Sequence, residues 1–198
     1  MAIRNIRIDG DPILRKRSKE VKNITPRILQ LLEDMEETMM DDEGIGLAAV
    51  QVGILKRIIV VAIGNLRFKM INPQVTKRSL EEQLDIEGCL SIPDFHGTVY
   101  RPEEISVKYL DPQGQEKEIQ AKGLLARCIL HEIDHLDGVL FKDRVDKVIN
   151  LANPTEDMLD YLKEHHLYSD DNEEVDQKEE TKERIEINEH EKEIKEEK

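Results

Sequence analysis

Negative charge is concentrated at the carboxyl end of this 198-residue chain, and this uneven distribution limits which residues can build a folded core. The last thirty residues, 169–198, hold 14 Asp and Glu against 6 Lys and Arg, so they carry −8 of the total net charge of −14. Their only aliphatic side chains are Val175, Ile185, Ile187 and Ile194. So little apolar surface does not offset the entropy lost when a packed unit becomes ordered. We therefore expect one folded domain over residues 1–168 and an acidic tail over 169–198 that is disordered or a solvated helix.

The composition also excludes several classes of protein. No apolar run approaches the ~20 residues of a membrane span, and the amino end, MAIRNIRIDGDPILRKRS, lacks the apolar core of a secretory signal. We expect a soluble, cytoplasmic protein that contacts no membrane. No strongly basic patch is present, so direct DNA binding is not expected. The two cysteines, Cys89 and Cys128, are too few for a disulfide-rich scaffold, and each is expected to be a buried, reactive or metal-bound thiol.

Turn and capping signals divide the first 168 residues. Thr25 followed by Pro26 is typical of a helix start, and Gly64 followed by Asn65 is typical of a two-residue hairpin turn. The predicted elements are a helix from 26 to about 44, strands at 57–63 and 66–71, a hairpin at 104–122, an apolar helix at 124–136 and a last helix from about 153 to 166. Helices interspersed with hairpins favour an α+β domain with antiparallel sheet.

The segment HEIDH, residues 131–135, lies in the predicted apolar helix. His131 and His135 are four residues apart, which is about 6 Å along a helix axis, so both imidazoles face one side and can bind one cation. Glu132 beside them can act as a general base toward water at such an ion. The alternative is a helix whose polar face carries two histidines by chance, because a motif with three fixed positions is short.

A catalytic divalent ion needs a third protein ligand and an open position. Cys128 lies about 10 Å along the helix axis from His135, so we expect a buried thiol there instead of a ligand. Cys89 stands in EGCLSIP between Gly88 and Pro93, and we expect a loop that brings its thiolate in from another direction. A small buried hydrophobe is the alternative for Cys89. The other histidines are expected in ordinary surface roles: His96 in a loop, His165 and His166 near the final helix, and His190 in the tail.

The segment GIGLAAVQVG, residues 44–53, contains two glycines and two alanines near its start, so its backbone can approach another backbone or a ligand closely. Gln51 is its only polar side chain. A buried primary amide needs a partner, and its NH2 group is a good donor to a developing oxyanion. A glutamine that only satisfies neighbouring backbone groups is the alternative.

In this order, GIGLAAVQVG, EGCLSIP and HEIDH resemble the three signature motifs of the bacterial peptide deformylases, and the resemblance covers most of residues 1–168. It implies removal of the formyl group from the N-terminal formylmethionine of new polypeptides, with release of formate. It also implies antiparallel sheets packed around the helix that carries the histidines, followed by a carboxy-terminal helix. HExxH alone would also fit a metallopeptidase, and a structural zinc module would need a fourth protein ligand.

The resemblance assigns a role to each candidate residue. It implies that the metal ligands are Cys89, His131 and His135. It implies that Glu132 is the general base and acid, and that Gln51 and the Leu90 backbone N–H stabilise the oxyanion. It implies that the residues that bind the substrate methionine are Ile45, Gly46, Leu124 and Cys128.

The expected cofactor is one divalent metal per chain. The resemblance implies Fe2+, and a Cys/His/His set also suits Zn2+, Ni2+ or Co2+. The expected partners are N-formylmethionyl nascent peptides and, transiently, the ribosome. Because the tail carries −8 and RNA phosphates are negative, we do not expect the tail to be the element that faces RNA.

Overall fold

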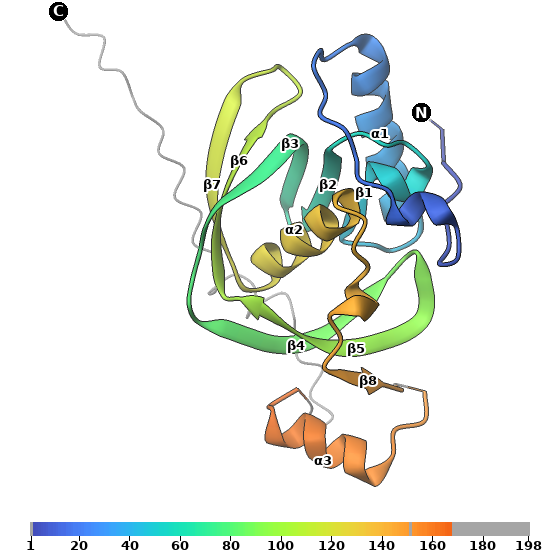
Figure 1. Cartoon of the computed structure of the whole chain (residues 1–198), viewed down its shortest axis with the longest axis vertical. Helices are drawn as coiled ribbons and strands as arrows, with labels where there is room; N and C mark the ends of the chain where they lie inside the picture. Colours follow the sequence, from blue (N-terminus) through green and yellow to red (C-terminus); the bar gives the residue numbers. More distant parts are fainter. Residues whose placement is uncertain (1, 151, 168–198) are drawn as a thin grey trace, which may run out of the picture.

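In the computed structural model, residues 2–150 and 152–167 are described (Figure 1). The helices are α1 (Pro26–Asp41), α2 (Gly123–Leu136) and α3 (Glu156–Glu164), with short 3₁₀ turns η1 (Pro12–Arg15), η2 (Ala49–Val52) and η3 (Phe141–Asp143). The strands are β1 (Gly46–Ala48), β2 (Ile58–Ile63), β3 (Leu66–Arg78), β4 (Glu82–Cys89), β5 (Ile92–Pro102), β6 (Glu104–Leu110), β7 (Glu116–Lys122) and β8 (Lys147–Ile149). The predicted tail, 169–198, lies outside the described residues, so its order stays a prediction.

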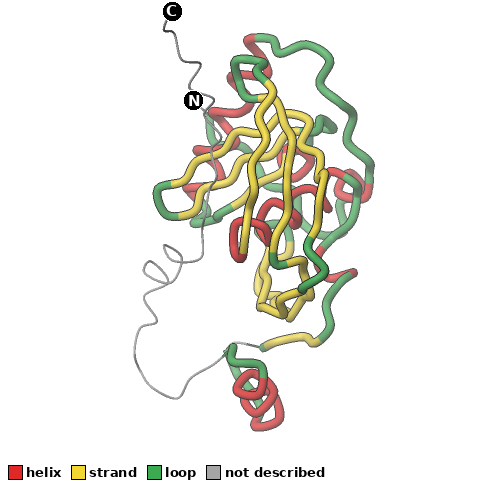
Figure 2. The backbone as a smooth tube through the Cα atoms, turned by 90° about the vertical axis from the view of Figure 1, so that its left-hand side faces the viewer, coloured by secondary structure: helices red, strands yellow, loops and turns green. Residues whose placement is uncertain are grey.

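The strands form two antiparallel sheets, one with the order β1-β2-β3-β6-β7 and one with the order β4-β5-β8. Both predicted hairpins are confirmed. The first closes at Gly64 and Asn65 with Ile63 opposite Leu66. The second turns at Asp111, whose Oδ1 accepts the N–H groups of the residues at 113 and 115. The predicted α+β class with antiparallel sheets is therefore confirmed (Figure 2).

Strand β2 is buried on both faces, which explains its unbroken apolar sequence IIVVAI. Ile59 and Val61 point into a core shared with α2, while Ile58 and Val60 point to the opposite face, against α1. Figure 1 shows α2 enclosed between the sheets, with α3 beyond β8. Because α2 lies at the centre, its side chains meet residues from both sheets.

The segment around Cys89 differs from the expected loop. Cys89 is the last residue of β4 and pairs with Ile92 at the start of β5, and Pro93, expected to end regular pairing, lies inside β5. Pro93 is tolerated because β8 pairs with β5 only from His96 to Thr98, so β5 is an edge strand where the proline lies. His96, also expected in a loop, lies in β5 opposite Ile149.

The ends of the helices agree with the predicted ends to within a few residues. α1 ends at Asp41, three residues before the predicted stop. α3 begins at Glu156, where the Thr155 hydroxyl accepts the Met158 N–H at 3.3 Å and caps the helix, instead of at residue 153. Within the described ranges, none of the helices combines the length and the apolar character that a bilayer crossing requires.

Candidate active site

The structure brings the three predicted ligands together. Cys89 comes from the end of β4, and His131 and His135 come from successive turns of α2. Their donor atoms lie within 4.8 Å of one another, and Cys89 Sγ is 3.2 Å from His135 Nε2. Cys128 is not part of this group. As expected, it is a buried thiol, and its Sγ donates to the Ile45 carbonyl at 3.5 Å.

The donor set fits a divalent transition metal. A thiolate and two imidazoles suit Fe2+, Co2+, Ni2+ or Zn2+. His135 is fully buried, and its Nδ1 atom has no hydrogen-bond partner among the described residues. Burial, together with the neighbouring His131, holds the pKa of His135 well below its usual value, so the imidazole stays in the neutral form that binds metals.

A cavity of about 620 Å3 opens beside these side chains. Apart from His135, which is fully buried, every predicted site residue lines it: Ile45, Gly46, Gln51, Cys89, Leu90, Leu124, Cys128, His131 and Glu132. Ile45 and Leu124 keep 43% and 37% of their surface exposed although both are large and apolar. An apolar hollow next to a potential metal site is suited to an apolar side chain of a ligand.

The carboxyl of Glu132 is buried without full hydrogen bonding. Its Oε2 atom has no partner among the described residues, and burial raises its pKa to about 7. Gly46 makes room for it, since a Cβ at position 46 would lie 2.5 Å from Glu132 Oε1 and 2.7 Å from Cys128 Sγ. The close approach expected for the glycine-rich segment is thus an approach to the acid of the site.

The contacts of Gln51 agree in part with both roles considered for it, a donor to an oxyanion and a partner of neighbouring backbone groups. Its Oε1 accepts the Ala48 N–H at 2.8 Å, so a neighbouring backbone group does hold the amide. Its Nε2 donates to Ser91 Oγ at 3.1 Å and lies 3.7 Å from Cys89 Sγ, so the NH2 group points into the site. Leu90 lies between Cys89 and Ser91 at the same wall of the cavity.

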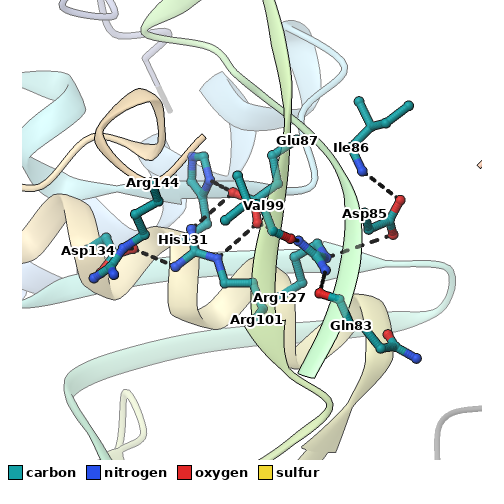
Figure 3. Close-up of polar contacts among 10 residues, drawn as sticks. All are labelled: Gln83, Asp85, Ile86, Glu87, Val99, Arg101, Arg127, His131, Asp134 and Arg144. Atoms are coloured by element: carbon teal, nitrogen blue, oxygen red, sulfur yellow. Dashed lines mark hydrogen bonds and ion pairs between the residues drawn. The ribbon is translucent and has the colours of Figure 1, made fainter. Parts of the chain in front are cut away.

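Glu87 is a site residue that the sequence analysis did not single out (Figure 3). It accepts from His131 Nδ1 at 2.9 Å, from Arg101 Nε and Nη2 at 2.9 and 3.0 Å, and from Arg127 Nη1 at 2.8 Å. Burial raises the pKa of Glu87, but the hydrogen bonds from His131 and Arg101 outweigh burial and keep that pKa well below its usual range. Because an ionised carboxylate only accepts, Nδ1 of His131 carries a proton, so Nε2 is the ring atom through which His131 would bind a metal. Burial lowers the pKa of His131, but its hydrogen bonds with Cys89 and Glu87 outweigh burial and raise that pKa to about 10, so binding a metal would displace the Nε2 proton.

Two further charged residues extend this network. Asp134, one residue before His135, accepts hydrogen bonds from Arg101 Nη1 at 2.5 Å and from Arg144 Nε and Nη2 at 2.6 and 2.7 Å. Three members of this network, Glu87, Asp134 and Arg127, could have been found from the sequence. Glu87 and Asp134 lie inside EGCLSIP and HEIDH, and Arg127 is a lone charge in the apolar run LLARCIL, which demands a buried partner.

Comparison with known proteins identifies the family. The model of the polypeptide deformylase family matches residues 3–150. The chain belongs to this family. Peptide deformylases of Finegoldia magna and Caldanaerobacter subterraneus are 50% and 51% identical to it, over 77% and 79% of this chain and 93% and 96% of those proteins. The crystal structure of peptide deformylase from Thermotoga maritima is similar, with a TM-score of 0.72 and 40% identity, over 74% of this chain and 99% of that one.

Membership decides between the alternatives that HEIDH alone leaves open. The family match spans all three segments, from before GIGLAAVQVG to beyond HEIDH, so a metallopeptidase that shares only HExxH is not favoured. A structural zinc site is not favoured either, because the group of donor atoms found among residues 2–150 and 152–167 has three members, not four. The match ends before the acidic tail.

Proposed function

We propose that the chain is a hydrolase that removes the formyl group from the N-terminal formylmethionine of newly synthesised polypeptides and releases formate. Family membership supports this activity. The observation that carries it is the position of the buried Glu132 carboxyl, whose Oε2 has no partner within residues 2–150 and 152–167, beside Cys89, His131 and His135. A group of donor atoms and a buried proton acceptor at one cavity are the parts that hydrolysis of a formamide requires.

One divalent metal per chain is part of the proposal. Cys89, His131 and His135 would hold it, and Fe2+ is the metal we assign, with Zn2+, Ni2+ or Co2+ suited to the same ligands. When bound, such an ion supplies Lewis-acid chemistry at the formyl group.

Glu132 is the group to which we assign proton transfer. Its carboxylate accepts a proton from the attacking water, the water oxygen forms a bond to the formyl carbon, and the C–N bond then breaks. The protonated carboxyl returns that proton to the departing amine, so formate and a free N-terminus are the products. A pKa of about 7 lets the same group accept and donate near neutral pH.

Gln51 and Leu90 are the groups to which we assign stabilisation of the tetrahedral oxyanion. The Ala48 N–H fixes Gln51 Oε1, so the amide does not flip and its NH2 group stays directed toward Cys89. Leu90 directly follows Cys89 in the chain, so its backbone N–H lies next to the candidate ligand. Removing one such donor costs about 2.7 to 4 kcal/mol of transition-state stabilisation in comparable sites.

The methionine side chain is assigned to the apolar part of the cavity, which is formed by Ile45, Gly46, Leu124 and Cys128. An unbranched thioether fills an irregular apolar hollow well. The nascent chains and the ribosome, in the cytoplasm, are the partners that this substrate implies. The tail is assigned no part in RNA contact, because its −8 charge would be repelled by phosphate.

The decisive experiment measures formate release from a formyl-Met peptide together with metal content. We expect stoichiometric formate, about one metal per chain, and no cleavage of internal peptide bonds in the same substrate. Internal cleavage without formate would replace this proposal with an endopeptidase. Metal bound without either reaction would replace it with a structural site.

The assignment of Fe2+ has a separate test. Activity of the Fe2+-loaded protein should decay in air, and loading with Ni2+ should slow that decay, because ferrous iron is redox-active. Mass spectrometry should find added oxygen on Cys89 and not on the buried Cys128. Equal decay of the two forms would remove the reason for choosing iron.

A further inference from the structure

Arg101 lies at the centre of a buried chain of charges that connects the two parts of the proposed metal site (Figure 3). It is 4% exposed, and all three of its guanidinium nitrogens are occupied. Nε and Nη2 grip Glu87 on β4, and Nη1 grips Asp134 on α2. Arg101 itself belongs to β5, so a single side chain joins three elements.

The two carboxylates that Arg101 joins, Glu87 and Asp134, lie close in sequence to the candidate ligands. Glu87 lies two residues before Cys89, and it also holds His131 through Nδ1. Asp134 lies one residue before His135. The three ligands come from two elements, β4 and α2, and Cys89 lies more than forty positions before His131 in the chain. The distances between the ligands therefore depend on how the β4–β5 hairpin packs against α2.

We propose that Arg101 is a positioning residue that sets the separation of Cys89 from His131 and His135, by fixing the β4–β5 hairpin to α2 through Glu87 and Asp134. This inference rests on the proposed metal site. Arg127 and Arg144 hold the outer ends of the chain, since Arg127 binds only the Glu87 end and Arg144 only the Asp134 end. In the described part of the chain, Arg101 is the one side chain that donates to both carboxylates.

The shape of the guanidinium is essential to this role. Its planar fork donates to two carboxylates in fixed directions, whereas a lysine ammonium is a point charge at the end of a flexible chain. Arg101→Lys therefore keeps the buried charge and loses the geometry. Asp134→Asn removes the negative charge that pairs with Arg101 on the helix, while the contacts of Arg101 with Glu87 remain.

An arginine–carboxylate pair outside the cavity lining supplies a control. Arg4 donates through Nε and Nη2 to the buried Asp34 at 3.1 and 2.7 Å, and neither residue lines the cavity. Arg4→Lys makes the same chemical change in an arginine–carboxylate pair that has no contact with Glu87, Arg101 or Asp134. It separates a general loss of stability from a specific effect on the ligands.

The test is Co2+ binding to the full-length wild type and to these variants, followed by chelator competition and by the visible absorption bands of Co2+. We expect Arg101→Lys and Asp134→Asn to weaken Co2+ binding about 10- to 100-fold and to shift the bands, as loss of outer-shell partners does elsewhere. Arg4→Lys should leave both readouts within about twofold, because neither Arg4 nor Asp34 lines the cavity or contacts a candidate ligand.

The outcomes are distinct. If the wild type binds Co2+ and Arg101→Lys binds it equally with the same spectrum, the positioning role is wrong and the proposed site survives. Equal weakening in Arg101→Lys and Arg4→Lys would also overturn the role, because the effect would then be general destabilisation. A wild type that does not bind Co2+ overturns the proposed site and this inference together.

Discussion

Two buried carboxylates that line the cavity, Glu87 and Glu132, have opposite environments. Glu87 accepts four hydrogen bonds from Arg101, Arg127 and His131, and its pKa lies well below the usual range. Glu132 has an oxygen with no partner among the described residues, and its pKa is raised to about 7. Both are less than a tenth exposed, so burial alone does not distinguish them.

The difference shows how a protein assigns two roles to one functional group. A carboxylate that is saturated with cationic donors is fixed in charge and position, so it can orient a neighbouring imidazole. A carboxylate that lacks such donors pays the full desolvation cost when ionised, and can therefore gain and lose a proton near neutral pH. This comparison predicts that removal of Glu132 affects reactivity and that removal of Glu87 affects structure.

The largest expected effect is on turnover. Glu132→Ala should retain about one metal per chain and lose about 10²- to 10⁴-fold in the rate of formate release, because this side chain is assigned to proton transfer and not to ligation. His135→Ala should lose the metal as well. A Glu132→Ala variant that hydrolyses formyl-Met peptides at near the wild-type rate would show that the proton-transfer assignment is wrong.

Glu87→Gln tests the other half of the comparison. It removes the shared charged partner of the buried Arg101 and Arg127, and Arg101 keeps only Asp134. Breaking a buried ion pair typically costs about 3 to 5 kcal/mol of unfolding free energy. Denaturant unfolding measures this loss. As a control, Glu33→Gln removes a solvent-exposed partner of Lys69 and should cost no more than ~1 kcal/mol. Equal, small losses in both variants would contradict the role of the network.

The raised pKa of Glu132 predicts a pH dependence of stability in the metal-free protein. The carboxyl binds its proton more tightly when folded, with a pKa of about 7 against an ordinary value of 4.5, so its contribution to stability falls as the pH rises between these values. Glu132→Gln does not ionise. Its advantage in unfolding free energy over the wild type should grow to about 3 kcal/mol from pH 4.5 to 7 and then level off. A constant difference across this range would show that Glu132 has an ordinary pKa.

The smallest effect is expected from the acidic tail. Deletion of residues 169–198 should leave metal content and turnover of a short formyl-Met peptide within about twofold, because every candidate site residue lies between Ile45 and His135. Ribosome affinity, measured by co-sedimentation at low salt, should stay the same or rise. A truncated enzyme that keeps peptide activity and no longer sediments with ribosomes would identify the tail as a docking element.

Much of the fold and of the candidate site could be predicted from the sequence because the relevant signals are local. Helical spacing places His131 and His135 on one face of α2, and the Gly64–Asn65 turn fixes the register of β2 and β3. The motif order gave the family, which the comparisons confirmed. The predicted loop around Pro93 was wrong, because that prediction rested on a single residue that disfavours strand pairing and not on a repeating pattern of apolar residues.

The sequence by itself determined which residue types are available, in which order, and which of them share a helix face. Only the tertiary structure decided that Cys89 meets His135, that Gly46 makes room for Glu132, and that Glu87, Arg101 and Asp134 form a single chain of ion pairs. The physical reason is that protonation, ligand distance and hydrogen bonding depend on groups far apart in sequence that burial brings within a few ångströms. Two glutamates in neighbouring motifs therefore look alike in the sequence and differ in the folded protein.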